Sequence, residues 1–182
     1  KYNNYELIFE DFLGANVKNK LKEFDYKELL IVANLPYYIT TPIIKKIIED
    51  EILADKIVIM IQKEVADRFS AKVNTKDYSS LTVFLNYYYD IKKLFNVSKN
   101  MFYPKPEVDS SVILMSKRKE KKFIKDINKF NEIVRDSFKY KRKNLRNNLQ
   151  GYDLVKIEEI LNKYNLSLTS RAENIPLHVF IE

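Results

Sequence analysis

The sequence of 182 residues contains no cysteine, no tryptophan, two glycines and a single histidine, His178. Without cysteine, the chain cannot form disulfides, thiolate zinc sites, iron–sulfur clusters or cysteine nucleophiles. Two isolated glycines, Gly14 and Gly151, cannot build a phosphate-binding loop of the G-x-G-x-x-G or Walker type. One histidine excludes the H-E-x-x-H motif, and no serine lies in a G-x-S-x-G turn. These absences exclude the common nucleophilic, zinc-dependent and nucleotide-loop mechanisms for these residues.

Long hydrophobic runs are also missing. The longest, such as Leu29–Ala33 and Ile57–Ile61, are far shorter than the ~20 residues that a membrane span requires. Apolar residues make up 46% of the chain and aromatic residues 13%, which predicts a packed core rather than disorder. We therefore expect a protein without a membrane partner, and the lack of cysteine is typical of a reducing compartment such as the cytoplasm.

Positive charge is concentrated in one segment. The net charge is +7, and 13 of the 32 basic residues lie from Lys117 to Arg146. These 13 include four of the six arginines of the chain. A lysine-rich composition with a solvated surface would explain the lysines but not the position of the arginines. This distribution favours a surface that binds nucleic acid.

Helical spacing divides residues 130–149 into two faces of one predicted helix. The apolar face comprises Phe130, Val134, Phe138, Leu145 and Leu149. A separate stripe steps by four, three and four residues, and two further lysines flank it: Arg135, Lys139, Arg142 and Arg146, with Lys141 and Lys143. We expect this stripe to contact an RNA backbone, with an affinity that falls as salt rises.

The remaining pattern predicts an α/β domain followed by helices. Strands are expected at Tyr5–Phe9, Leu29–Ala33, Lys56–Ile61, Ile91–Val97 and Val108–Met115, and helices at Ile43–Asp50, Gln62–Ala71 and Leu81–Tyr88. Alternation of strands and helices predicts a largely parallel sheet, with Leu29–Ala33 covered on both faces. Thr41 is the expected N-cap of its helix, with Pro42 at the first helical position. Only helical patterns follow Ser116, so we expect domains at 1–118 and 119–182.

Two segments could form one site. Asn34, Leu35, Pro36 and Tyr37 follow a predicted strand, where open α/β sheets bind ligands. Phe102 begins a proline-stiffened loop before the last strand. Taken alone, the first segment would be an ordinary turn. Together, the two rings could stack on a flat base, while Asn34 and a backbone carbonyl near Leu35–Pro36 accept hydrogen bonds from an exocyclic amine.

Such acceptors suit an adenine N6 atom, whose lone pair is delocalised into the ring. Hydrogen bonds placed tetrahedrally around the nitrogen favour its pyramidal form and so free the lone pair for attack. The chemistry then depends on positioning and preorganised dipoles, without histidine or cysteine. The base would have to leave its stack to reach the site.

Five motifs, in order, resemble those of one enzyme family. They are NLPYYITTPII (Asn34–Ile44), QKEVADRF (Gln62–Phe69), FYPKPEVDSSV (Phe102–Val112), FKYKRKNLRNNL (Phe138–Leu149) and SRAENI (Ser170–Ile175). From about Tyr5 to the C-terminus, the chain resembles the bacterial small-subunit ribosomal RNA dimethyladenosine transferases. The macrolide-resistance methyltransferases of large-subunit RNA share the first and third motifs loosely and usually lack the second and fifth, so they are the weaker match.

The resemblance implies a class I, Rossmann-like methyltransferase sheet and a small helical C-terminal domain. The donor would be S-adenosylmethionine, without a metal, and the substrate would be two adjacent adenines near the 3′ end of 16S rRNA in the small subunit or its precursor. Asn34, Leu35, Pro36 and Tyr37 would bind the target base, and Phe102 would stack on its other face. Asp11, with Phe12 nearby, would contact the donor's adenine, and Asn34 would touch donor and acceptor.

The chain departs from this family at its start. The family's glycine-rich donor loop and its acidic ribose ligand follow the first and second strands, and this chain begins at the third. Because the family's strand order is 3-2-1-4-5-7-6, Leu29–Ala33 should form an exposed sheet edge. We therefore expect a piece of a longer protein that lacks donor binding and either dimerises or pairs Tyr5–Phe9 with Leu29–Ala33. A non-catalytic RNA-binding or ribosome-assembly module and a helical interaction domain remain the alternatives.

Overall fold

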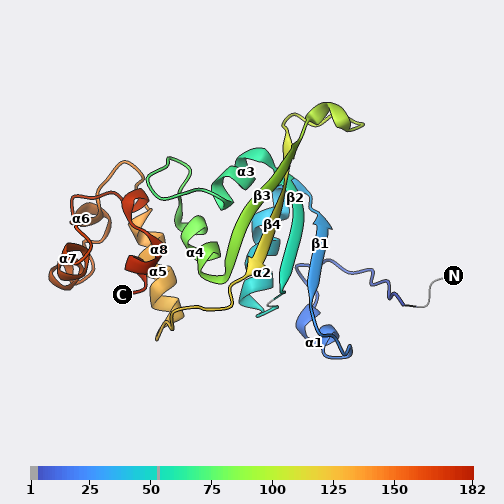
Figure 1. Cartoon of the computed structure of the whole chain (residues 1–182), viewed down its shortest axis with the longest axis horizontal. Helices are drawn as coiled ribbons and strands as arrows, with labels where there is room; N and C mark the ends of the chain where they lie inside the picture. The colour runs from blue at the N-terminus through green and yellow to red at the C-terminus, as the bar shows by residue number, and fades with distance from the viewer. Residues whose placement is uncertain (1–3, 53) are drawn as a thin grey trace.

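The computed structural model describes residues 4–52 and 54–182. Its centre is a four-stranded sheet with the order β1-β2-β4-β3 (Figure 1). The strands are β1 (Leu30–Asn34), β2 (Lys56–Gln62), β3 (Tyr89–Val97) and β4 (Ser110–Lys117). β1 and β2 are parallel, whereas β4 is antiparallel to both β2 and β3. Three strands, β1, β2 and β3, therefore run in one direction. The expectation of a largely parallel sheet is wrong for β4, which follows β3 in a hairpin and runs in the opposite direction.

The observed strand order matches the 4-5-7-6 end of the order that the resemblance implies, with β1 at the edge as expected. The expected strand at Tyr5–Phe9 is wrong, because these residues are exposed and unpaired coil in the part of the chain described. The expected pairing of Tyr5–Phe9 with β1 is also wrong, since β2 is the one strand that pairs with β1 among the described residues. A strand needs a neighbour to satisfy its backbone groups, and this segment has none.

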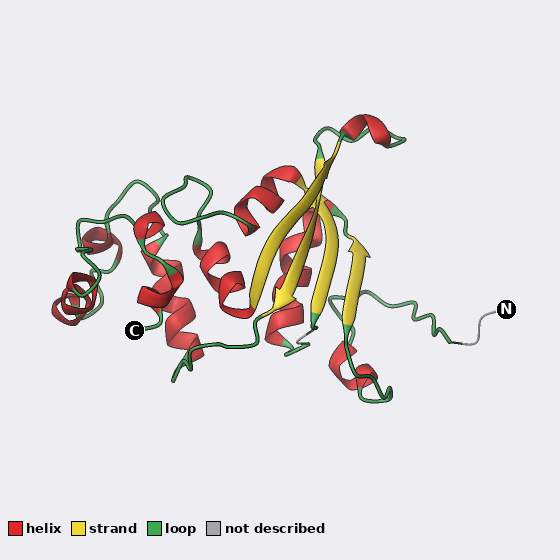
Figure 2. Ribbon diagram, in the orientation of Figure 1, coloured by secondary structure: helices red, strands yellow, loops and turns green. Residues whose placement is uncertain are grey.

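Helices cover one face of the sheet (Figure 2). They are α2 (Thr40–Glu49), α3 (Lys63–Phe69) and α4 (Ser80–Tyr88), with the short α1 (Val17–Leu21) packing at the margin. Inward residues of neighbouring strands, such as Ile57, Ile59 and Ile113, pack with the helices in the main core. The expectation that Leu29–Ala33 is covered on both faces is wrong, because Leu30 and Val32 are 53% and 78% exposed.

α2 begins earlier than the sequence predicts. A 3₁₀ turn, η1 (Tyr37–Ile39), leads directly into Thr40, so Thr41 and Pro42 are the second and third helical residues and neither is the N-cap. Proline lacks a backbone N–H group. Pro42 is tolerated because N–H groups in the first turn of a helix have no intrahelical partner.

The C-terminal part is helical. Its elements are α5 (Ile127–Ser137), α6 (Leu145–Asn148), α7 (Leu154–Asn162), η3 (Ala172–Asn174) and α8 (Leu177–Phe180). α5, α6 and α8 carry two further core clusters, one among the helices and one joining Tyr78 and Val83 to Phe130 and Val134 of α5. Residues 118–126 link β4 to α5, where a domain boundary is predicted. Within the described ranges, no helix is both long and apolar enough to cross a membrane.

Candidate functional site

The segment Asn34–Tyr37 lies at the carboxyl end of β1 and is tied to the start of α2. The Pro36 carbonyl accepts hydrogen bonds from the Ile39 N–H and the Thr40 hydroxyl, each at 3.2 Å, and Thr40 is buried. Asn34 ends the strand with an exposed side chain, and Leu35 is half-buried. Because the Pro36 carbonyl is already engaged, the Leu35 carbonyl is the better candidate for a second acceptor beside Asn34.

Tyr37 is held from the other side by β4. Its hydroxyl lies 2.6 Å from the hydroxyl of Ser110, the first residue of β4, and Ser110 is completely buried. Ser110 pairs with Gln62 and with Val97, so it is fixed within the sheet. The bond restrains the half-buried ring of Tyr37 and couples the segment after β1 to the strand that follows Phe102.

The loop that starts at Phe102 closes the β3–β4 hairpin. Before it, η2 (Lys99–Met101) is braced by the Asp109 carboxylate, which accepts the Lys99 N–H at 2.9 Å, and by the Lys99 ammonium, which donates to the Glu107 carbonyl at 3.1 Å. Phe102 is half-buried. The hairpin extends beyond the ends of β1 and β2 (Figure 1). Within the described chain the rings of Tyr37 and Phe102 do not form an aromatic pair, so a base would have to fit between separate rings.

Asp11 and Phe12 lie in a turn that precedes α1. The Asp11 carboxylate accepts the Leu13 N–H at 3.0 Å, and its backbone carbonyl accepts two further N–H groups. The Asp11 side chain is exposed, and Phe12 packs on the main core. The following helix is anchored near the C-terminal end of α2, where Lys18 pairs with Glu51 at 2.6 Å. Among the described residues, no hydrogen bond joins Asp11 to Asn34.

These residues fit only one end of S-adenosylmethionine. An exposed carboxylate and an aromatic ring suit an adenine amine and its face. Neither glycine forms a cradle for the rest of the molecule, because a Cβ on Gly14 would meet its nearest atom at an ordinary 3.7 Å and one on Gly151 would meet nothing within 4 Å. Both glycines also lack the positive φ that a tight glycine turn uses. Neither glycine therefore provides the close backbone approach with which a glycine-rich loop holds its ligand.

The basic segment is not one helix, so this prediction is wrong. α5 ends at Ser137, a turn spans residues 138–143, and α6 starts after Asn144. Asn144 caps α6 by accepting the Asn147 N–H at 3.1 Å, and the Asn148 amide donates to the Ser137 carbonyl at 2.7 Å. These asparagine contacts compete successfully with helix continuation. The predicted apolar face is nevertheless buried at Phe130, Val134, Leu145 and Leu149.

The predicted cations form an exposed cluster around this turn rather than a helical stripe. We call it the basic turn: Arg135, Lys139, Lys141, Arg142, Lys143 and Arg146. Arg135 pairs with Asp136 at 3.3 Å, and Arg146 lies 3.9 Å from Glu158. Lys141 donates to the Lys76 carbonyl at 2.5 Å, which fixes the turn to the α3–α4 loop. Most of the positive charge thus faces solvent.

Hydrogen bonds lower the pKa of two carboxylates, Asp136 beside the basic turn and Asp67 in α3. The Tyr152 hydroxyl donates to Asp136 at 2.7 Å, and this bond, with that from Arg135, lowers the pKa of Asp136. Hydrogen bonds from Lys93 and Lys63 similarly lower the pKa of Asp67, near the carboxyl end of β2.

Sequence reasoning missed Ser110, although two serines opening an alternating apolar strand were a usable signal of a polar strand end.

Comparison with known proteins places the chain in a family. The family model for ribosomal RNA adenine dimethylase matches residues 1–181. "Ribosomal RNA small subunit methyltransferase A" of Oceanobacillus iheyensis is 39% identical over 100% of this chain and 65% of its own length. The proteins of that name from Streptococcus thermophilus and Mycoplasma mobile are 43% and 40% identical over 94% and 99% of this chain, and 60% and 68% of their lengths. The chain thus spans less than two thirds of the first two relatives.

Solved structures agree on the fold. A dimethyladenosine transferase from Plasmodium falciparum superposes with a TM-score of 0.77 at 25% identity, over 98% of this chain and 70% of that one. The 23S rRNA methyltransferase ErmE superposes with a TM-score of 0.65 at 22% identity, over 93% and 66% of the two chains, which shows a shared fold alone. The expected Rossmann-like methyltransferase fold and the expected family are therefore confirmed, and this chain belongs to the ribosomal RNA adenine dimethylase family.

Proposed function

We propose that these residues carry the base-accepting and RNA-binding parts of an S-adenosylmethionine-dependent enzyme. This enzyme dimethylates N6 of two adjacent adenines near the 3′ end of small-subunit rRNA, in ribosome biogenesis in the cytoplasm. The observation that carries the proposal is the Asn34–Tyr37 segment, which presents an exposed amide at the carboxyl end of β1 and is fixed on both sides by hydrogen bonds.

In this proposal the acceptor side works by positioning. Asn34 Oδ1 and the Leu35 carbonyl accept the two N–H bonds of the adenine amine, Pro36 sets the direction of the chain, and Tyr37 and Phe102 stack on the base. The Ser110 bond limits rotation of Tyr37, so less freedom is lost when the base binds. Stacking on aromatic side chains contributes about 1–3 kcal/mol per base, enough to hold a flipped adenine.

The donor supplies an electrophilic methyl group when it is bound. Asp11, Phe12 and Asn34 would meet its adenine end only, so we expect these 182 residues alone to bind S-adenosylmethionine weakly. Calorimetry with S-adenosylmethionine tests this part of the proposal. Heat evolution with a micromolar dissociation constant would contradict it.

The basic turn is the proposed contact with rRNA. Its exposed cations would neutralise backbone phosphates and release counterions, which makes the affinity depend steeply on salt. The rival role, an RNA-binding assembly module without methyl transfer, would use the same basic turn but would leave Asn34 without a base to bind. A large-subunit methyltransferase is less favoured, because the relatives quoted above carry a small-subunit name.

Binding of an RNA strand that keeps both target adenines and carries 2-aminopurine at the position beside them separates these roles. We expect the fluorescence of this neighbour to change when a target adenine leaves the stack, and Asn34→Ala to raise the protein concentration needed for half of this change about tenfold, because the contact with the adenine N6 amine is lost. Asn100→Ala, another exposed asparagine near the site, is the matched control. Equal signals from the wild-type chain and Asn34→Ala would overturn the base-accepting role and leave only RNA binding.

A further inference from the structure

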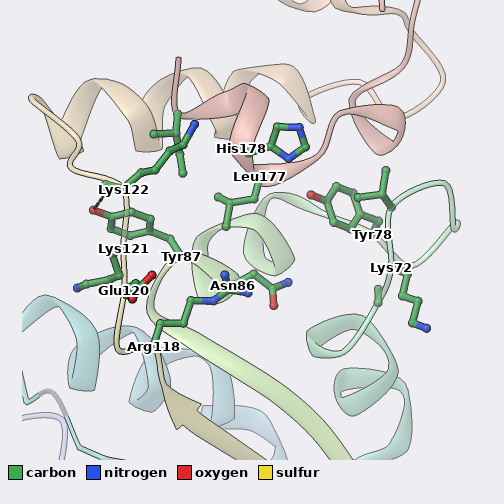
Figure 3. A pocket seen from close by; sticks show the side chains of 13 residues that line it. Lys72, Tyr78, Asn86, Tyr87, Arg118, Glu120, Lys121, Lys122, Leu177 and His178 are labelled. Atoms are coloured by element: carbon green, nitrogen blue, oxygen red, sulfur yellow. Dashed lines mark hydrogen bonds between the residues drawn. The ribbon is translucent and has the colours of Figure 1, made fainter. Parts of the chain in front are cut away.

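A cavity of about 860 Å³ lies where α4 and residues 118–122 meet α8. Asn86 and Arg118 both line it, and Figure 3 shows them between Tyr87 on one side and Tyr78 on the other. Leu177 and His178 of α8 face it from the helical part of the chain. None of the residues placed above in base, donor or basic-turn contacts lines this cavity, so it is a separate feature.

Arg118 leaves hydrogen-bonding capacity in the cavity. One terminal nitrogen, Nη2, pairs with Asp90 at 2.7 Å, outside the lining. Its Nε atom is buried and has no hydrogen-bond partner among the described residues. The Arg118 side chain as a whole is 35% exposed and lines the cavity, so an acceptor in the cavity can reach the guanidinium. The guanidinium geometry matches the oxygens of a phosphate.

The charge of the lining selects an anion. Four cationic side chains line the cavity against the single carboxylate of Glu120: Lys72, Arg118, Lys121 and Lys122. The Lys121 ammonium lies 5.4 Å from the centre of the Tyr87 ring and 5.0 Å from that of Tyr88, so cation–π contacts hold it at the rim. A ligand that fits this lining therefore combines an anionic group with a group that packs against aromatic rings.

The remaining walls suit a flat polar group. The half-buried Tyr87 and Leu177 provide aromatic and apolar surface, and the Asn86 amide offers both a donor and an acceptor. An amide beside aromatic rings is the combination with which proteins read the edge of an unstacked base. The volume lies within the range of ordinary ligand pockets.

We propose that this cavity binds one unstacked nucleotide of the RNA substrate, away from the adenine that is modified. The phosphate bonds to Arg118 and is attracted by Lys121 and Lys122, and the base lies against Tyr87 with its edge at Asn86. This proposal rests on the proposed function, because it takes RNA to be the ligand. Because the walls come from α4 and from α8, the bound nucleotide would also fix the sheet and the C-terminal helices relative to one another.

The test measures binding of a fluorescein-labelled, twelve-nucleotide single-stranded RNA to the full chain by anisotropy. We expect Arg118→Gln to weaken binding about tenfold, because a charge-assisted contact is removed. Lys119→Gln removes an equal charge from an exposed neighbour outside the lining, and we expect less than about a twofold change. Asn86→Asp, which places a carboxylate in the lining and leaves the Arg118–Asp90 pair intact, should also weaken binding.

The outcomes separate the two proposals. Equal losses in Arg118→Gln and Lys119→Gln, or no loss in folded Asn86→Asp, would overturn the cavity site. If only a variant of the basic turn lost RNA binding, the cavity proposal would fail and the proposed function would stand. A wild-type chain that bound no RNA would overturn both. Adenosine monophosphate should compete with the RNA at millimolar concentration, and equally effective competition by inorganic phosphate would show a simple anion site and overturn the nucleotide assignment.

Discussion

Tyr78 and Tyr89 are tyrosines whose rings are buried in the cores on either side of α4. Burial raises the pKa of each hydroxyl from 10.0 to about 12, since the charged form is poorly solvated. The folded state therefore holds these protons more tightly than the unfolded state. Their contribution to stability is fully present below pH 10 and is lost as the pH rises from 10 to about 12.

We expect the free energy of unfolding to fall over this window by about 2–3 kcal/mol for each tyrosine. Urea unfolding at intervals from pH 8 to pH 12 measures the fall. Tyr78→Phe should show a shallower fall than the wild-type chain. An identical pH dependence in the variant would contradict the burial of this hydroxyl.

At the scale of single residues, the sequence indicated the Asn34–Tyr37 segment because a polar residue and a proline directly follow an apolar run. The two serines that open β4 indicated a polar strand end, but the bond between Ser110 and Tyr37 depends on the pairing of β4 with β2 and β3, which the sequence alone does not show. The same limit applies to Arg118 and Asn86, which lie 32 residues apart in the sequence and meet only in the folded chain.

The break between α5 and α6 is the clearest result at the scale of elements. Apolar periodicity predicted which side chains are buried but not that the helix stops, because periodicity survives a turn that returns the chain to the same core. The asparagines at 144 and 148 supply the capping contacts, and asparagine favours helix ends over helix interiors. Most other elements lie within a few residues of their predicted positions.

Asn148 is the residue on which the turn depends. Its amide donates to the Ser137 carbonyl and its side-chain oxygen accepts the Tyr140 N–H at 3.2 Å. We expect Asn148→Ala to lower the free energy of unfolding by about 1–3 kcal/mol, because a partly buried carbonyl loses its partner. Thermal denaturation measures the change, with the exposed Asn147→Ala, whose side chain makes no such bond, as its control. Equal stability of the two variants would show that the turn does not require Asn148.

At the scale of the whole molecule, the sheet has one covered face and one open edge. Leu30 and Val32 are exposed on β1, and the apolar residues Tyr5, Leu7 and Phe9 are exposed in the segment before α1. The order of the strands could be predicted only from the family resemblance. The segment Tyr5–Phe9 forms no strand because, among the described residues, no neighbouring strand pairs with it. The division into two domains near residue 118 remains a prediction.

An open apolar edge favours self-association through strand pairing. We propose that these 182 residues form a dimer through β1, and expect sedimentation equilibrium to show association that rises with concentration. Val32→Lys should weaken it, because charge on an edge strand disfavours pairing. Lys92→Gln, on the strand at the opposite edge, is the control. A wild-type chain that stays monomeric at all concentrations would contradict the prediction.

The most direct test of the account is binding to small ribosomal subunits that lack the adenine methyl groups. We expect the wild-type chain to bind them with a strong dependence on salt, and the double variant Arg142→Glu, Arg146→Glu to bind at least tenfold more weakly. The control is Lys22→Glu, Lys27→Glu, an equal charge reversal at exposed positions before β1. Loss of affinity confined to the variant of the basic turn is the predicted result, and unchanged binding by that variant would contradict the proposed RNA-binding role.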